Sequence, residues 1–138
     1  AIANIKPRLR MATLYYFAQS YNYLVLGPSN KSEFTVGYFT KYGDSGVDLL
    51  PIASFVKTDI WKMARYLKIP DIVIGKPPTA GLWENQTDED EMGFSYDALD
   101  TYILEKTGSK GIIEKIEKMN RISEHKRNFP PIFIPKNR

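Results

Sequence analysis

Two short apolar segments with a helix-forming stretch between them constrain the fold of this 138-residue chain most strongly. The first, YLVLG at Tyr23–Gly27, ends in Gly-Pro, which predicts a buried strand. Asn30 then has the character of a helix N-cap, and VDLLPIA at Val47–Ala53 predicts a second strand. Strand, helix and strand in this order form a βαβ unit, so the sequence predicts an α/β fold with a parallel sheet. Two strands are few for a sheet covered on both faces, so the predicted sheet is incomplete in this chain.

Helical spacing of apolar residues predicts further helices on both sides of this unit. Pro7 suits the first turn of an N-terminal helix, and Ile60 to Leu67 carry the pattern of a helix that stops before Pro70. Two more helices follow Ser95 and Gly108, and a short turn is expected at Ser123. The segment Gly75–Gly93 has no period and predicts a long loop, a kind of segment that is usually functional or mobile.

Composition narrows the class of protein. The chain has no cysteine, which excludes disulfides and thiol catalysis, and no apolar run approaches the ~20 residues of a membrane span. A single cytosolic domain fits this composition. The net charge of +3 is unevenly distributed, because residues 84–105 carry eight acids and no base, whereas residues 106–138 carry nine bases and three acids. Scattered basic residues favour small anions such as nucleotide phosphates at least as much as nucleic acid.

Ligands of open α/β sheets bind at the carboxyl ends of the strands, and three polar segments are expected there. Pro28–Glu33 follows the first predicted strand, Lys57 follows the second, and the loop with Thr79 can fold over the same edge. On spacing alone Glu33 is favoured as the partner of Asn30 in a capping box. Lys57 opposes the dipole at a helix start, and a phosphate bound there would turn this cost into attraction.

Other charged residues have alternative interpretations. Asp48 lies inside an apolar run and must either face solvent or bind a donor. Lys41 can pair with Asp44 across its loop, and His125, the only histidine, is more often a surface group than a catalyst in such a basic context. These residues alone support a nucleotide-binding α/β protein.

Several collinear segments together resemble the ammonia-dependent NAD synthetase family. They are NIKPRLRM, LVLGPSNKSE, GYFTKYGDSGVDLLPI, KTDIWKMARYL, IPDIVIGKPPTAGLW, QTDEDEMGFSYDALD and EHKR. The resemblance implies a Rossmann-like fold of the ATP-pyrophosphatase type (adenine nucleotide alpha hydrolase-like), with a parallel sheet and flanking helices. It also implies a ligase of NAD biosynthesis, a homodimer that amidates deamido-NAD with ATP and ammonia through an adenylated carboxylate, releasing AMP and pyrophosphate.

The resemblance also implies roles for individual residues. It implies that Glu33 binds Mg²⁺. The positions that resemble ATP contacts are Lys57, Thr79 and Pro28, the last standing where the family commonly has threonine. Those that resemble deamido-NAD contacts are Arg8, Lys41, Asp48, His125 and Lys126. The acidic stretch QTDEDE resembles a mobile segment that closes near the site.

The family's phosphate loop, of the form Ser-Gly-Gly-x-Asp-Ser, is absent from the sequence. Residues 1–138 are therefore expected to be the carboxyl-terminal portion of a single synthetase domain. Two alternatives stay open: a non-catalytic fragment of that enzyme, and a basic RNA-binding or tRNA-modifying ATP-pyrophosphatase relative. KYGDSGVD favours a dinucleotide substrate, and the lack of a basic-aromatic stripe disfavours RNA. Neither nucleic acid nor membrane is expected as a partner.

Overall fold

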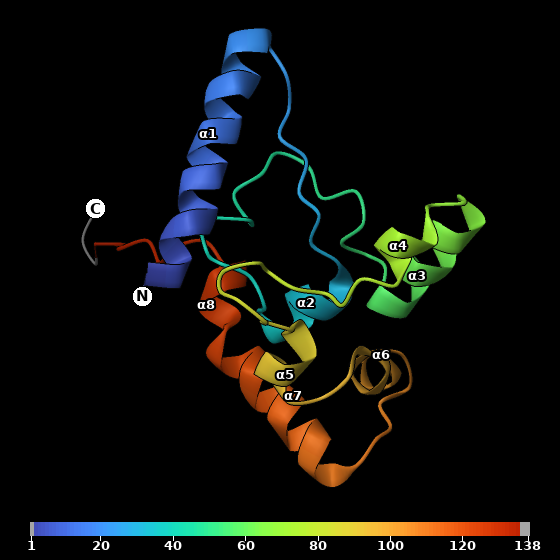
Figure 1. Ribbon diagram of the computed structural model, residues 1–138. Coiled ribbons are helices and arrows are strands. Elements are labelled where there is room, and N and C mark those ends of the chain that lie inside the picture. Colours follow the sequence, from blue (N-terminus) through green and yellow to red (C-terminus); the bar gives the residue numbers. More distant parts are fainter. Residues whose placement is uncertain (1, 136–138) are drawn as a thin grey trace.

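The computed structural model of the chain describes residues 2–135 as helices joined by loops (Figure 1). In chain order the elements are η1 (Ile2–Asn4), α1 (Ile5–Tyr21), α2 (Lys31–Val36), α3 (Lys57–Tyr66), α4 (Asp71–Ile74), α5 (Asp88–Met92), α6 (Tyr96–Glu105), α7 (Lys110–Ile122) and α8 (Glu124–Arg127). None of the helices in residues 2–135 combines the length and the apolar character that crossing a membrane requires.

The predicted parallel sheet is wrong for this structure, because the described residues contain no strand. The two apolar segments do meet, but only through one parallel bridge between Leu26 and Leu49. Gly27 N donates to Leu49 O at 2.8 Å, and Leu24 and Leu26 remain 70% and 59% exposed. A short apolar run specifies extended backbone as readily as a strand, and one isolated pair lacks the neighbouring strands that stabilise a ladder. The Rossmann-like α/β fold class is therefore corrected to an all-helical arrangement with one extended contact.

The predicted helices are found, and local signals explain most of their boundaries. Asn30 caps α2 in a full capping box with Glu33, and Ser95 caps α6 by accepting from Ala98 N at 3.2 Å. The segment Gly75–Gly93 is not entirely loop, since it contains α5, whose N-cap Thr87 accepts from Asp90 N at 3.2 Å. Four acids in the first turn of α5 favour its helix dipole, a local signal that the lack of periodicity hid.

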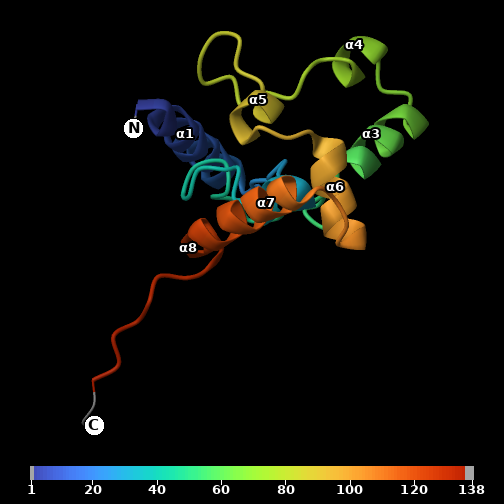
Figure 2. The same ribbon diagram turned by 90° about the horizontal axis from the view of Figure 1, so that it is seen from below.

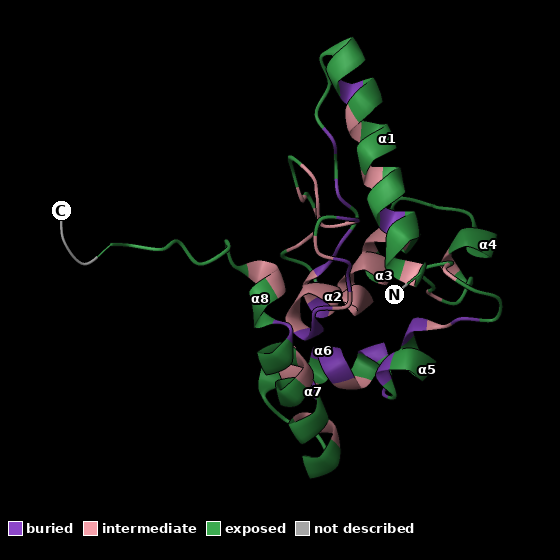
Figure 3. Ribbon diagram, turned by 90° about the vertical axis from the view of Figure 1, so that its left-hand side faces the viewer, coloured by how far each residue is buried: buried purple, intermediate pink, exposed green. Residues whose placement is uncertain are grey.

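The hydrophobic core lies where α2, α5, α6 and α7 meet (Figures 2 and 3). Its buried members are Val36, Met92, Phe94, Tyr96, Leu99 and Ile116. Helix α7 is amphipathic, with Ile116 fully buried and Ile112 and Met119 packed at the edge of the core. This core holds α2 and α5, the two helices that carry acidic residues of the candidate site.

Helix α1 is built differently, because it projects from the rest of the molecule (Figure 1). Only Pro7 and Ala18 of its 17 residues are buried. Apolar side chains around it, including Leu9, Leu14 and Phe17, are more than half exposed.

The chain after α8 extends away from the helices (Figure 2). Residues 128–135 have no regular secondary structure, and Phe129, Ile132 and Phe133 are each more than 80% exposed. Pro130, Pro131 and Pro135 in this segment lack a backbone N–H and disfavour regular structure.

Candidate functional site

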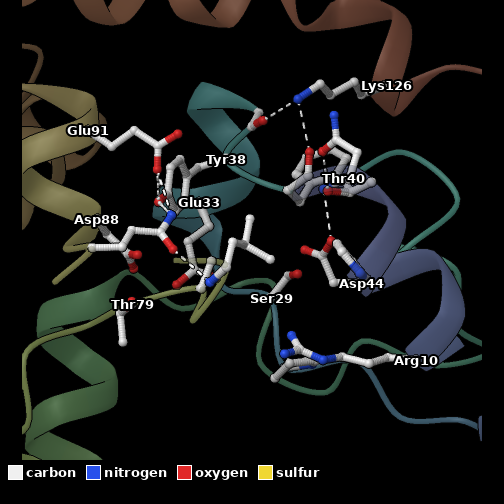
Figure 4. Close-up of a pocket in the computed structure, with 18 of the residues that line it drawn as sticks. Arg10, Ser29, Glu33, Tyr38, Thr40, Asp44, Thr79, Asp88, Glu91 and Lys126 are labelled. Atoms are coloured by element: carbon white, nitrogen blue, oxygen red, sulfur yellow. Dashed lines mark hydrogen bonds between the residues drawn. The ribbon is translucent and has the colours of Figure 1, made fainter. Parts of the chain in front are cut away.

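A cavity of about 420 Å³ opens between α1, the N-terminal ends of α2 and α3, the loop after α4, α5 and α8 (Figure 4). Its polar lining includes Asn4, Arg10, Ser29, Glu33, Tyr38, Thr40, Asp44, Lys57, Thr79, Gln86, Asp88, Glu91 and Lys126. Pro28 lies in the wall as well. The cavity therefore collects both signs of charge from segments that are far apart in the sequence.

Glu33 and Lys57 form an ion pair in the wall of this cavity. Lys57 Nζ lies 3.1 Å from Glu33 Oε1, and both side chains are less than a fifth exposed. Glu33 Oε2 also accepts from Asn30 N at 3.2 Å, so the capping box and the ion pair share one carboxylate. Lys57 Nζ lies 4.9 Å from the centroid of the Tyr96 ring, which adds a cation–π contact. The expected cost of a positive charge at the start of α3 is thus offset by Glu33.

The backbone at the start of α3 is already hydrogen-bonded within the protein. Lys57 N donates to Ser32 Oγ at 2.9 Å, and Thr58 N donates to an oxygen of Asp100 at 2.8 Å. An anion near this helix would therefore meet the Lys57 ammonium rather than free N–H groups. If a phosphate binds at this helix start, the Lys57 side chain is therefore the group that contacts it, and the backbone N–H groups are not.

Asp88 and Glu91 of α5 line the cavity near Glu33 (Figure 4). The Tyr38 hydroxyl donates to Glu91 Oε2 at 2.6 Å, and Gln86 Nε2 donates to the same oxygen at 2.8 Å. The Tyr96 hydroxyl donates to Asp88 Oδ2 at 2.9 Å. Burial raises the pKa of Tyr38 far above its usual range, and the neighbouring carboxylates Glu91 and Asp88 raise it further. The pKa of Tyr96 is likewise raised, first by burial and then by Glu33 and Asp88, so both tyrosines act as hydroxyl donors.

Asp88, which also lines the cavity, has a carboxylate oxygen that is relevant to cation binding. Its side chain is buried, and Oδ1 has no hydrogen-bond partner among the described residues. Residues 2–135 contain no cluster of three or more acidic, histidine or cysteine side chains placed to hold a metal ion. Mg²⁺ is commonly held by one or two carboxylates together with substrate phosphates and water. The carboxylate of Glu33, which lies in the cavity wall, has the donor chemistry that this mode requires.

Lys126 lies at the opposite end of the cavity from Glu33 and Thr79 (Figure 4). Its Nζ donates to Gly37 O at 2.8 Å and to Phe39 O at 2.9 Å. Burial lowers the pKa of Lys126; the negative charge of Asp44 works against this shift, and the positive charge of Arg127 adds to it. Asp44 accepts from Thr40 N at 2.8 Å and forms none of the ion pairs found in residues 2–135, so its predicted pairing with Lys41 is not observed.

Four of the residues expected to contact deamido-NAD lie outside this cavity. Arg8 is exposed and donates to Lys41 O at 3.4 Å, while Lys41 Nζ donates to His125 O. Asp48 accepts from Tyr15 OH at 3.0 Å and from Val25 N at 2.8 Å, so it binds donors although it is exposed. His125 lines an adjacent hollow that it shares with Lys126.

The structure thus brings Pro28, Glu33, Lys57, Thr79 and Lys126 together, and Arg8, Lys41 and His125 form a separate chain of contacts. The sequence interpretation missed several residues of the cavity, mainly Tyr38, Asp44, Gln86, Asp88 and Glu91. The closing role that the resemblance implies for the acidic stretch around Asp88 stays a prediction. The Thr87 N-cap of α5 is the sequence signal that would have placed its individual side chains.

Comparison with known proteins assigns the family. Residues 1–130 match the family described as NAD synthase. The NH(3)-dependent NAD(+) synthetase of Carboxydothermus hydrogenoformans is 54% identical over 132 residues, which are 96% of this chain and 54% of that protein. The namesake of Finegoldia magna is 56% identical over 133 residues, which are 96% of this chain and 55% of that protein. The chain therefore spans about half the length of the curated relatives it matches.

Two solved synthetase structures superpose on nearly the whole chain. The structure of NMN synthetase from Francisella tularensis superposes with a TM-score of 0.91 at 40% identity, over 97% of this chain and 56% of the other. The NH3-dependent NAD synthetase from Campylobacter jejuni, in complex with the nitrate ion, gives 0.73 at 32% identity, over 95% of this chain and 54% of the other. With a family match that extends over nearly its whole length, the chain belongs to the NAD synthase family.

Proposed function

We propose that the protein amidates deamido-NAD with ammonia at the expense of ATP, forming NAD, AMP and pyrophosphate. Family membership supports this reaction, because the curated relatives are named NH(3)-dependent NAD(+) synthetases. The observation that carries the proposal is the meeting in one cavity of the Glu33–Lys57 pair, Thr79 and Lys126. Amidation of a carboxylate needs phosphate binding and charge neutralisation more than a protein nucleophile, and this set of side chains offers both.

In the first step an oxygen of the nicotinate carboxylate attacks the α-phosphorus of ATP, and pyrophosphate leaves. We assign Lys57 to the phosphates, since its ammonium lies in the cavity wall while its helix backbone is already bonded. Thr79 and the backbone beside Pro28 complete this end of the cavity, with Ser29 next to the proline. A Mg²⁺ ion held by Glu33 and the phosphates would supply positive charge to the leaving group.

In the second step ammonia attacks the carboxyl carbon of the adenylate, AMP leaves, and the nitrogen loses a proton. We place the dinucleotide toward Lys126, with Arg8, Lys41, Asp48 and His125 as contacts around the edge of the site. The half-buried Lys126 ammonium already donates to two backbone carbonyls, so it presents a fixed positive charge to an anionic ligand. Turnover would then depend on position and electrostatics rather than on covalent catalysis.

Glu33 is the sharpest test of this proposal. In the full-length protein, Glu33→Gln should fold, bind deamido-NAD nearly as the wild type does, and require much more Mg²⁺ for turnover, because a neutral amide is a poor ligand for a hard dication. Glu114→Gln, at an exposed position of α7, is the matched control. Superimposable Mg²⁺ titrations of activity for wild type and Glu33→Gln would leave Glu33 as a cap and an ion-pair partner only.

A second candidate substrate comes from the structural comparison. The superposition of TM-score 0.91 is with a protein described as an NMN synthetase, which makes nicotinate mononucleotide the alternative acceptor. The values of kcat/KM for the two carboxylates, measured side by side in the full-length protein, decide between them. A value for the mononucleotide above that for deamido-NAD would overturn the proposed substrate while retaining the chemistry.

We also propose that residues 1–138 form the carboxyl-terminal part of one synthetase domain that acts as a homodimer. The half-length match to the relatives and the exposed apolar side chains of α1 support this view. The 138-residue chain alone should then form no NAD from deamido-NAD, ATP, Mg²⁺ and ammonia. Robust turnover by this chain would contradict its being only part of the catalytic domain. A monomer in sedimentation of the active protein would contradict the homodimer.

A further inference from the structure

Asp100 is a buried carboxylate that the proposed reaction leaves without a role. It lies on α6, is 2% exposed, and does not line the cavity. The ion pairs found within residues 2–135 do not include it. An unpaired buried charge is costly, so the hydrogen bonds that Asp100 makes must be what stabilises it.

Those hydrogen bonds lead to the first turn of α3. One oxygen of Asp100 accepts from Thr58 N at 2.8 Å, and the other accepts from the Ser32 hydroxyl. Ser32 Oγ in turn accepts from Lys57 N at 2.9 Å. The N-cap residue of α3 is Val56, whose side chain has no acceptor. Asp100 and Ser32 therefore cap α3 from two other helices, and the charge of Asp100 is favourable at this helix N-terminus.

This junction lies directly behind the wall of the cavity. Ser32 precedes Glu33 on α2, and Lys57 is the first residue of α3, so one hydrogen-bonded cluster fixes the backbone of both partners of the ion pair. A substitution at this junction that moved α3 relative to α2 would change the 3.1 Å distance between Lys57 Nζ and Glu33 Oε1, although the substituted residue touches no ligand.

We infer that Asp100 is a positioning residue, which acts through Ser32 and the first turn of α3 to hold Lys57 against Glu33 at the phosphate end of the cavity. The inference deepens the proposed function and rests on it only for the activity measurements. Asparagine in place of Asp100 keeps the shape and one acceptor, but it loses the charge and presents an amide N–H₂ to one of its two partners.

The first test uses turnover in the full-length protein. Asp100→Asn should lower kcat about tenfold, the size of one lost hydrogen bond at a positioned group, with a smaller change in the KM for the carboxylate substrate. Asp97→Asn, on the exposed side of the same helix, should leave kcat unchanged. In a Lys57→Ala background, Asp100→Asn should have no further effect on kcat, because residues that act through one another are not additive. Additive losses would overturn the inference.

The second test needs no activity. Lys57 lies over the ring of Tyr96 at 4.9 Å, so ring-current shielding should shift the NMR signals of its ε-methylene protons upfield. Asp100→Asn should reduce that shift, and Asp97→Asn should not. An unchanged shift in folded Asp100→Asn would overturn the positioning role. Failure of the wild-type protein to amidate its substrate would reject the proposed function, while this measurement would still decide the role of Asp100.

Discussion

The α6–α7 region and helix α1 are both rich in apolar residues, yet they differ sharply in burial. Helix α6 has 10 residues and buries Tyr96 and Leu99 completely. Helix α1 has 17 residues, and its Leu14 and Phe17 are 54% and 51% exposed. Figure 3 shows the contrast as a buried cluster around α6 and a mostly exposed α1. Apolar content therefore does not indicate which helix supports the fold, and we expect stability to depend on the core of α2, α5, α6 and α7.

The largest expected effect is a cavity in that core. Leu99→Ala should lower the free energy of unfolding by about 2–5 kcal/mol, because a fully buried leucine leaves unfilled volume. Leu14→Ala on α1 makes the same chemical change at a half-exposed site and should cost less than about 1 kcal/mol. Urea denaturation of both variants measures the difference. Equal losses would show that α1 contributes as much to stability as the core does.

A backbone change at the joint between α2 and α7 comes next. Gly37 has φ 68°, and a Cβ there would lie 2.1 Å from the Cβ of Ser123. Gly37→Ala should therefore cost about 2–4 kcal/mol, the sum of backbone strain and overpacking. Gly81→Ala has a similar φ of 61° with open space around it, and should cost only the strain, about 1 kcal/mol. Thermal unfolding of the two variants measures both losses of stability, and their difference is the cost of overpacking at Gly37. Equal losses would show that overpacking contributes nothing.

Removal of the Tyr96 hydroxyl should have a smaller effect that changes with pH. Tyr96→Phe leaves Asp88 Oδ2 without this donor and should cost about 1–3 kcal/mol at neutral pH. The pKa of Tyr96 is raised in the folded state, so the unfolded chain binds fewer protons once the pH exceeds its ordinary pKa of 10.0, and stability falls as pH rises further.

Denaturation series above and below pH 10.0 can test this sign. The alkaline decline should be shallower in Tyr96→Phe than in the wild type. The matched control is Tyr16→Phe on α1, whose hydroxyl lies on a mostly exposed side chain, and it should decline as the wild type does. A steeper decline in Tyr96→Phe would reverse the assignment.

The smallest effect concerns Lys126. Burial lowers its pKa below 10.5 in the folded protein, so the unfolded chain binds more protons between the folded pKa and 10.5, and this group makes stability rise with pH in that interval. Lys126→Met should remove that contribution, as seen in denaturation series across the same interval. Lys118→Met, at an exposed position of α7, should leave the pH dependence unchanged.

The sequence predicted those features of the fold that neighbouring residues determine. Asn30 and Ser95 predicted the starts of α2 and α6 through their capping side chains, and the capping box of Glu33 was correctly favoured. The strand predictions were wrong because the patterns YLVLG and VDLLPIA indicate only that a segment is apolar. Whether such a segment joins a sheet depends on the neighbouring strands, and here Leu26 and Leu49 form a single bridge.

The candidate site was predictable only in part, for a related reason. Glu33, Lys57 and Thr79 were expected to converge at the carboxyl edge of a sheet; they do line one cavity, although the described residues contain no strand. The direct contact between Glu33 and Lys57 joins residues on two helices, which spacing along one helix cannot reveal. Asp88 was hidden in a run of acids, where only the fold separates a buried side chain from exposed neighbours.

The extended tail after α8 also affects how the protein will be observed spectroscopically. Phe129–Pro130, Pro130–Pro131 and Ile134–Pro135 are bonds to proline in an exposed segment without regular structure. In such segments each bond populates the cis isomer at roughly 5–30% and interconverts over seconds to minutes. Residues 129–134 should therefore give several sets of slowly exchanging resonances, although the helical core gives one. Such signal doubling reports prolyl isomers of one folded molecule and not a mixture of folds.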